Sequence, residues 1–161
     1  MSRMRATRGV ELTTDALFQK RVRRLVAVSA VALGLIFWLS VGDGAPLWVL
    51  ALIGTGWILM PTFLAASLSK PSMRHLLVVP ATAVGVGLIA MTLNTEGANQ
   101  AGWLLMTLGI LSGGTLGAWF WYRWLPVPRL FDEPFGWPRL ILLAGHIGLV
   151  LLGFGVLLTA S

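Results

Sequence analysis

Five long apolar runs account for most of this chain and leave few folds open to it. No Asp, Glu, Lys or Arg lies within Leu25–Val41, Leu47–Leu68, Leu76–Leu93, Ala101–Tyr122 or Leu140–Ala160. A transmembrane helix needs about 20 apolar residues to cross roughly 30 Å of hydrocarbon. Within lipid, a helix also satisfies its own backbone hydrogen bonds. We therefore predict an all-α integral membrane protein, a bundle of five transmembrane helices.

The composition excludes proteins that fold in water. Hydrophobic residues make up 57% of the 161 residues and charged residues only 11%, whereas soluble domains carry about 25% charge. The chain has no cysteine, which excludes disulfides and thiolate metal sites. The sequence thus divides into a basic cytoplasmic or interfacial segment, residues 1–24, and a five-helix membrane domain, residues 25–161.

Basic residues fall on one side of the predicted bundle. Seven of the twelve precede the first run: Arg3, Arg5, Arg8, Lys20, Arg21, Arg23 and Arg24. Two, Lys70 and Arg74, lie between the second and third runs, and three, Arg123, Arg129 and Arg139, lie between the fourth and fifth. The other two connections carry only Asp43 and Glu96. The positive-inside rule then predicts a cytoplasmic N-terminus and an outside C-terminus in the cell inner (plasma) membrane.

Aromatic residues mark the two predicted interfaces. The outer set is Trp38, Trp48 and Trp103, and the inner set is Trp119, Trp121, Tyr122, Trp124 and Trp137. Trp and Tyr concentrate at the headgroup level of membranes. Trp57 alone falls in the middle of a predicted span, where its indole N–H needs a partner.

The first run has two interpretations. It is short, and Ser40-Val41-Gly42 offers the small residues of a signal-peptide cleavage site. The long preceding region, which includes acidic Glu11 and Asp15, favours an uncleaved anchor instead. Thr14 is a candidate N-cap for a helix that carries the basic residues onto the anionic inner leaflet.

Small residues give the clearest packing signal. Gly109, Gly113 and Gly117 recur every four residues in the fourth run, and Gly85 and Gly148 belong to similar patterns in the third and fifth. Small residues let helices approach closely where lipid provides no hydrophobic drive. We expect these glycines to pack helices, either within one bundle or against a partner subunit or a second copy of the chain.

His146 is the one ionisable side chain within a run. An ionisable group inside a membrane is a functional candidate by default. It is our candidate cofactor-binding residue, for a b-type haem or a quinone, or a proton relay. The alternative is a neutral imidazole, with no cofactor, hydrogen-bonded to a backbone carbonyl, Ser112 or Thr115 of a neighbouring helix.

Thr55, Trp57 and Pro61 form a second candidate site. Proline removes a helix hydrogen bond and can kink a span. Together with the preceding polar and small residues, this predicts a small polar pocket; a kink without a pocket is the alternative.

Catalytic signatures are missing from the sequence. It contains no nucleophile–histidine–carboxylate set, phosphate-binding loop or zinc-protease motif. We therefore expect a non-catalytic inner-membrane protein that contacts lipid and no nucleic acid, most simply an accessory or scaffold subunit packed against other subunits or itself. The alternatives are a haem- or quinone-binding electron-transfer subunit centred on His146 and a small-molecule carrier or channel.

Overall fold

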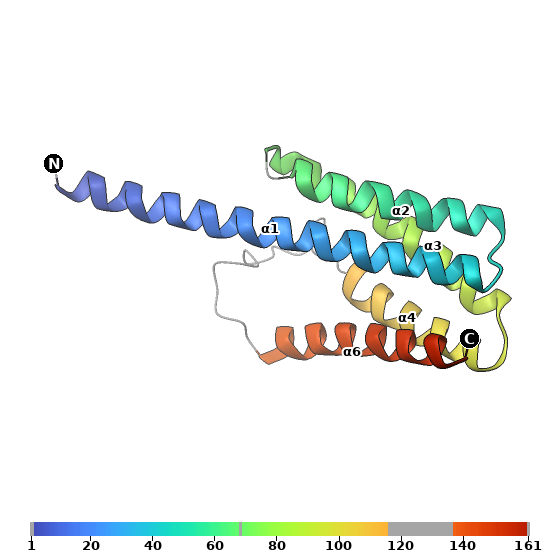
Figure 1. The fold of residues 1–161 in the computed structure, drawn as a ribbon. Helices are drawn as coiled ribbons and strands as arrows, with labels where there is room; N and C mark the ends of the chain where they lie inside the picture. The colour runs from blue at the N-terminus through green and yellow to red at the C-terminus, as the bar shows by residue number, and fades with distance from the viewer. Residues whose placement is uncertain (1, 68, 116–136, 161) are drawn as a thin grey trace.

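Helices make up most of the chain that the structure describes, and short turns such as residues 43–46 and 95–96 join them. The structure is a computed structural model and describes residues 2–67, 69–115 and 137–160. In order along the chain, the elements are α1 (Ser2–Gly42), α2 (Leu47–Ala66), a 3₁₀ helix η1 (Pro71–Leu77), α3 (Val78–Asn94), α4 (Gly97–Ile110), a π-helical turn η2 (Leu111–Thr115) and α6 (Trp137–Ala160) (Figure 1). The expected all-α class is confirmed for this part of the chain.

Three helical stretches are long and apolar enough to cross a membrane. They are Val22–Gly42, Leu47–Ala66 and His75–Asn94, and Ala144–Ala160 is a shorter apolar helix. The third stretch begins in η1, and Pro80 lies in the first turn of α3, where its missing N–H leaves no bond unmade. At these three places the sequence therefore correctly predicts helices that are long and apolar enough to cross a membrane.

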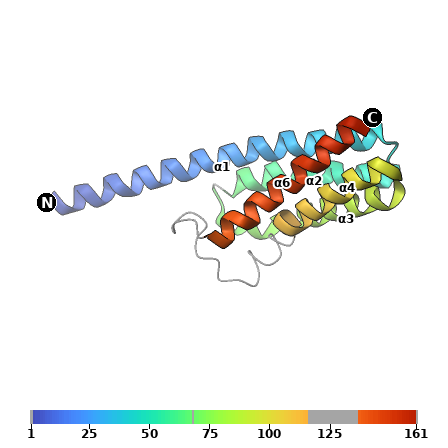
Figure 2. The same cartoon turned by 90° about the horizontal axis from the view of Figure 1, so that it is seen from below.

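The helices alternate in direction (Figure 1, Figure 2). The C-terminus lies at the same end of the bundle as the α1–α2 and α3–α4 connections, and α1 runs far beyond the bundle at the other end. At 1.5 Å per residue its 41 residues extend about 60 Å, twice the thickness of a hydrocarbon core. Because α1 begins at Ser2, Thr14 lies inside the helix, and its assignment as an N-cap was wrong.

Glycines bring α2 and α3 into close contact in the core. A Cβ built on Gly56 would lie 2.1 Å from Cγ2 of Val84, and one on Gly87 would lie 2.6 Å from Cγ1 of Ile53. Both distances are shorter than the van der Waals separation of two carbon atoms, so a side chain at either position would force its neighbour to move. Around them, bulky side chains from four helices are buried, among them Ile36, Ile53, Leu88 and Met106.

The carboxylate of Asp43 ties the α1–α2 connection to α4. The indole Nε1 of Trp103 donates to Oδ2 of Asp43 at 2.6 Å, and Nδ2 of Asn99 donates to Oδ1 at 3.2 Å. Trp103 is 0% exposed. Trp38 and Trp48 at this end are exposed, as residues of an interfacial belt are. Trp103 instead points into the bundle, where the Asp43 carboxylate is a strong acceptor for its indole N–H.

Replacing Trp103 with Phe should lower the free energy of unfolding by about 2 kcal/mol, since a hydrogen bond to a charged group contributes about 1.5–3 kcal/mol. Reversible unfolding of the detergent-solubilised protein measures the loss. Trp48→Phe is the matched control, because Trp48 is 54% exposed at the same end; it should change the value by less than about 0.5 kcal/mol. Equal effects of the two substitutions would contradict the anchoring role of Asp43.

Candidate functional site

The contact between α4 and α6 brings His146 together with two of the predicted packing glycines. A Cβ on Gly109 would lie 2.8 Å from Cγ2 of Val150, and one on Gly113 would lie 2.3 Å from Cγ of His146. On the facing helix, a Cβ on Gly153 would lie 2.7 Å from the carbonyl oxygen of Gly102. Gly117 lies outside the described residues. Glycine on both helices therefore allows the backbones to touch.

His146 is hydrogen-bonded to the backbone of α4. Its Nδ1 lies 2.5 Å from the carbonyl oxygen of Gly109, and Oγ of Ser112 donates to the same oxygen at 3.0 Å. A backbone carbonyl only accepts, so Nδ1 carries the proton. The sequence suggested a backbone carbonyl, Ser112 or Thr115 as the partner of His146. In the structure the partner is the backbone carbonyl of Gly109, which also accepts a hydrogen bond from Ser112.

This bond determines what the other nitrogen of the ring offers. In a neutral imidazole with a protonated Nδ1, Nε2 has a free lone pair that accepts a hydrogen bond or ligates a metal. The His146 side chain as a whole is half-buried. Within the described part of the chain, no three His, Cys, Asp or Glu side chains come together to hold a metal ion. A bare metal ion at His146 would therefore need further ligands from outside this part, whereas a haem iron needs only axial ligands from the protein.

α6 has a second face, opposite the first. At 100° per residue, His146, Val150, Gly153 and Leu157 share the side that contacts α4. The other side carries Gly148 and Gly155, and a Cβ added to either, or to Gly145, meets no described atom within 4 Å. Its large side chains are exposed as well: Ile147, Leu151, Leu152 and Leu158. No described residue of the chain covers this surface, which we call the outer face of α6.

The remaining predicted packing glycine, Gly85, is buried in α3. It lies on the helix that packs against α2 and α4. The structure thus buries Gly85 and Gly109, places the exposed Gly113 against His146, and leaves Gly148 without a described neighbour.

Of the candidate pocket residues in α2, Thr55 and Trp57 point to different sides of the helix, whereas Pro61 follows Trp57 by four residues on the same side. The indole Nε1 of Trp57 donates to the carbonyl oxygen of Ala30 in α1 at 2.9 Å, and its ring lies over Gly34. Thr55 is exposed and, two residues away, points about 200° around the helix from Trp57. The indole N–H that the sequence left without a partner is thereby satisfied by the neighbouring helix.

A polar contact between α3 and α4 escaped the sequence analysis. The hydroxyls of Thr92 and Thr107 lie 3.0 Å apart, and both donate to the carbonyl oxygen of Leu88, at 3.0 Å and 3.1 Å. The two threonines are visible in the sequence, one in the third apolar run and one in the fourth. Only the packing of the two helices shows that these threonines meet.

No known protein family, no curated protein and no solved structure shows significant similarity to this chain. Relatives therefore contribute nothing to the assignment of a function. The contacts of α4 and α6 are the strongest basis for one.

Proposed function

We propose that this protein is a non-catalytic accessory or scaffold subunit of a larger complex in the cell inner membrane. The outer face of α6 is the observation that carries this proposal. Gly148 and Gly155 stand seven residues apart on that face, so they lie on one line along the helix. The glycines at the contact with α4 are explained by packing within the chain, whereas these two have no described neighbour.

Glycine on an exposed helix surface needs a reason. It is about 1 kcal/mol less favourable than alanine in a helix, and lipid chains pack against leucine as well as against glycine. A second helix gains from glycine, because two backbones can then approach closely and make dense van der Waals contact. The occupant we propose is thus a transmembrane helix, from another subunit or from a second copy of the chain.

We further propose five spans with a cytoplasmic N-terminus and an outside C-terminus. The 14 residues of α4 and 5 of η2 reach about 28 Å, and the 24 of α6 about 36 Å, so both are long enough to cross. Lys20, Arg23, Arg24 and Lys70 precede or follow spans at one end, and Asp43 and Glu96 occupy the connections at the other. The positive-inside rule favours the basic end as cytoplasmic.

A second candidate function is supported by the geometry of His146. Metal-ligating histidines almost always donate their other N–H to a carboxylate or a backbone carbonyl, as Nδ1 does here to Gly109. The free lone pair of Nε2 also accepts a hydrogen bond from the hydroxyl of a reduced quinone, whereas the carbonyl of an oxidised quinone offers it no donor. The second candidate is therefore an electron-transfer subunit that binds a b-type haem or a quinone at His146.

The orientation predicts the behaviour of reporter fusions. Alkaline phosphatase attached after Ser161 should be active, because the enzyme matures only outside the inner membrane. Green fluorescent protein attached there should stay dark, whereas an insertion in the α2–η1 connection should fluoresce. A fluorescent C-terminal fusion would contradict the five-span topology.

The scaffold proposal predicts a particle that dissociates when the outer face of α6 is blocked. Native mass spectrometry of the protein, extracted from its own host in mild detergent, should show additional polypeptides. The double variant Gly148→Val/Gly155→Val should lower their recovery at least tenfold, since inserted methyl groups cost about 1–3 kcal/mol in a close-packed contact.

Gly42→Val is the matched control, because Gly42 is an exposed glycine at the end of α1 with no neighbour within 4 Å of an added Cβ. It should leave the particle intact, and both variants should keep the unfolding temperature of the wild-type chain. A wild-type protein recovered as a single chain, or partners retained by the double variant, would overturn the proposal. Additional copies of the chain alone would assign the face to a homo-oligomer.

The second candidate predicts a bound chromophore or quinone. Absorption spectra and solvent extracts of the purified protein should show a Soret band or a quinone, and His146→Ala should abolish it. Ser112→Ala is the control, since it removes the other donor to the Gly109 carbonyl and leaves the imidazole in place. A colourless, quinone-free protein whose spectrum is unchanged by His146→Ala would rule this candidate out.

A further inference from the structure

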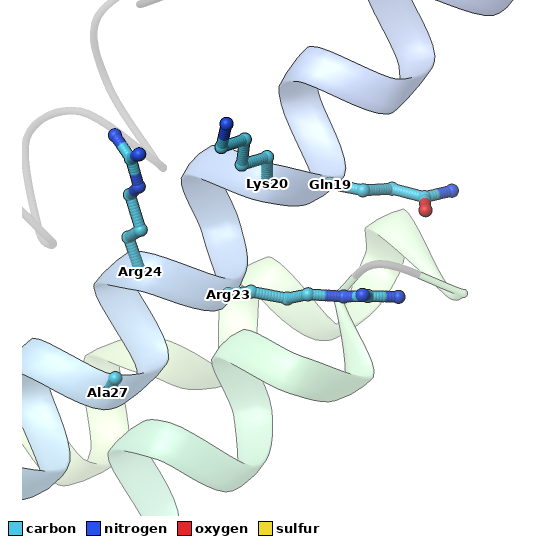
Figure 3. A pocket seen from close by; sticks show the side chains of 5 residues that line it. All are labelled: Gln19, Lys20, Arg23, Arg24 and Ala27. Carbon is cyan, nitrogen blue, oxygen red and sulfur yellow. The ribbon is translucent and has the colours of Figure 1, made fainter.

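Basic side chains surround a hollow where α1 leaves the bundle. The hollow has a volume of about 550 Å³, and its described lining is Gln19, Lys20, Arg23, Arg24 and Ala27. Figure 3 shows Lys20 and Arg24 extended on one side of the helix, and Gln19 and Arg23 extended on another. Three cations within five residues thus lie around one open space.

These cations have no acidic partner in the described part of the chain. The only Asp or Glu side chains that the structure describes are Asp43 and Glu96, in the connections at the opposite end of the bundle. Asp43 is moreover bound to Trp103 and Asn99. Among the described side chains, arginine and lysine thus cluster here without a carboxylate, which suits an anion, and the guanidinium fork matches phosphate geometry in particular.

The hollow continues into an exposed apolar stripe. Val28, Val31 and Leu35 follow Arg24 at spacings of four, three and four residues, so they share its face of the helix. Their side chains are 65%, 63% and 47% exposed. From Val28 to Trp38, which is exposed on the same face, the stripe measures about 15 Å, or half of a roughly 30 Å hydrocarbon core.

The depth of the hollow matches that of a lipid headgroup. The apolar span of α1 begins at Val22, within the basic cluster. The cations therefore stand at the border of the hydrocarbon, and Ala27 lies one turn inside it. A ligand that suits this surface has an anionic phosphate above and a hydrocarbon chain below.

We propose that the hollow lined by Lys20, Arg23 and Arg24 is a binding site for an anionic phospholipid, whose phosphate contacts these cations and whose acyl chain lies along Val28, Val31 and Leu35. The site is independent of the outer face of α6 and of any partner there. It differs from the general attraction of basic segments to anionic membranes. That attraction depends on the number of positive charges near the surface, whereas binding at a site depends on the particular residues that line it.

The test compares two triple variants of the full-length protein that lose the same charge. Lys20→Gln/Arg23→Gln/Arg24→Gln removes the lining of the hollow. Arg3→Gln/Arg5→Gln/Arg8→Gln removes three cations from the N-terminal part of α1, away from the bundle. Arg8 lies twelve residues before Lys20, or about 18 Å along the axis, which is about twice the Debye length at physiological salt.

Each detergent-solubilised protein is titrated with phosphatidylglycerol and, separately, with phosphatidylcholine of the same acyl chains, and native mass spectrometry gives the apparent Kd. Phosphatidylglycerol should bind the wild type more tightly. A cation near an anionic headgroup contributes about fivefold in affinity, so the first triple variant should lose on the order of 100-fold. The second should lose less than about fivefold, and phosphatidylcholine binding should be the same in all three proteins. Arg24→Lys, which keeps the charge, should bind more tightly than Arg24→Gln.

Equal losses in the two triple variants would overturn the proposal in favour of diffuse attraction. Inorganic phosphate separates the lipid from a soluble anion, because it offers a phosphate anion without the acyl chain. Phosphate should compete only at concentrations far above those of phosphatidylglycerol. If phosphate binds as tightly as the lipid, the apolar stripe contributes nothing and the lipid assignment is wrong. The C-terminal alkaline phosphatase fusion confirms that each variant inserts in the wild-type orientation.

Discussion

Contact between helix backbones at glycine positions is the interaction on which this bundle depends. In a hydrocarbon environment apolar side chains gain little by leaving lipid, so helices associate through dense packing and hydrogen bonds. Gly56 and Gly87 admit side chains of the facing helix between α2 and α3, and Gly109 and Gly153 do the same between α4 and α6. Those close approaches bring interhelical hydrogen bonds into range, of which His146 to the Gly109 carbonyl is the clearest example.

The helical class and three helices long and apolar enough to cross a membrane could be predicted, because they depend on local properties, namely apolar length and the residues of the turns. Gly44 and Gly97 both have a positive φ, at 70° and 62°, which is the conformation that favours glycine where a chain turns back. The length of α1 was harder to predict, because Ser2–Arg24 shows no apolar periodicity that distinguishes a helix from a basic tail. The five-span count and the orientation stay predictions of the charge pattern.

The candidate site was less predictable, because its features depend on which helices meet. The sequence shows that His146 needs a partner, but only the contact of α4 with α6 supplies the carbonyl of Gly109 and so determines which ring nitrogen carries the proton. Trp57 and Trp103 follow the same logic. One donates to Ala30 and the other to Asp43, across 27 and 60 residues of sequence, and no spacing rule anticipates either acceptor.

Two exposed surfaces of this bundle look alike in hydropathy and differ in shape. On α1 the exposed stripe is built from Val28, Val31 and Leu35, and the nearby Gly34 is covered by the ring of Trp57. On α6 the exposed side chains alternate with uncovered glycines at 148 and 155. Flexible acyl chains adapt to a surface of branched side chains, whereas a rigid helix gains most where its own backbone can come close. The difference in shape therefore favours lipid at α1 and a protein helix at α6.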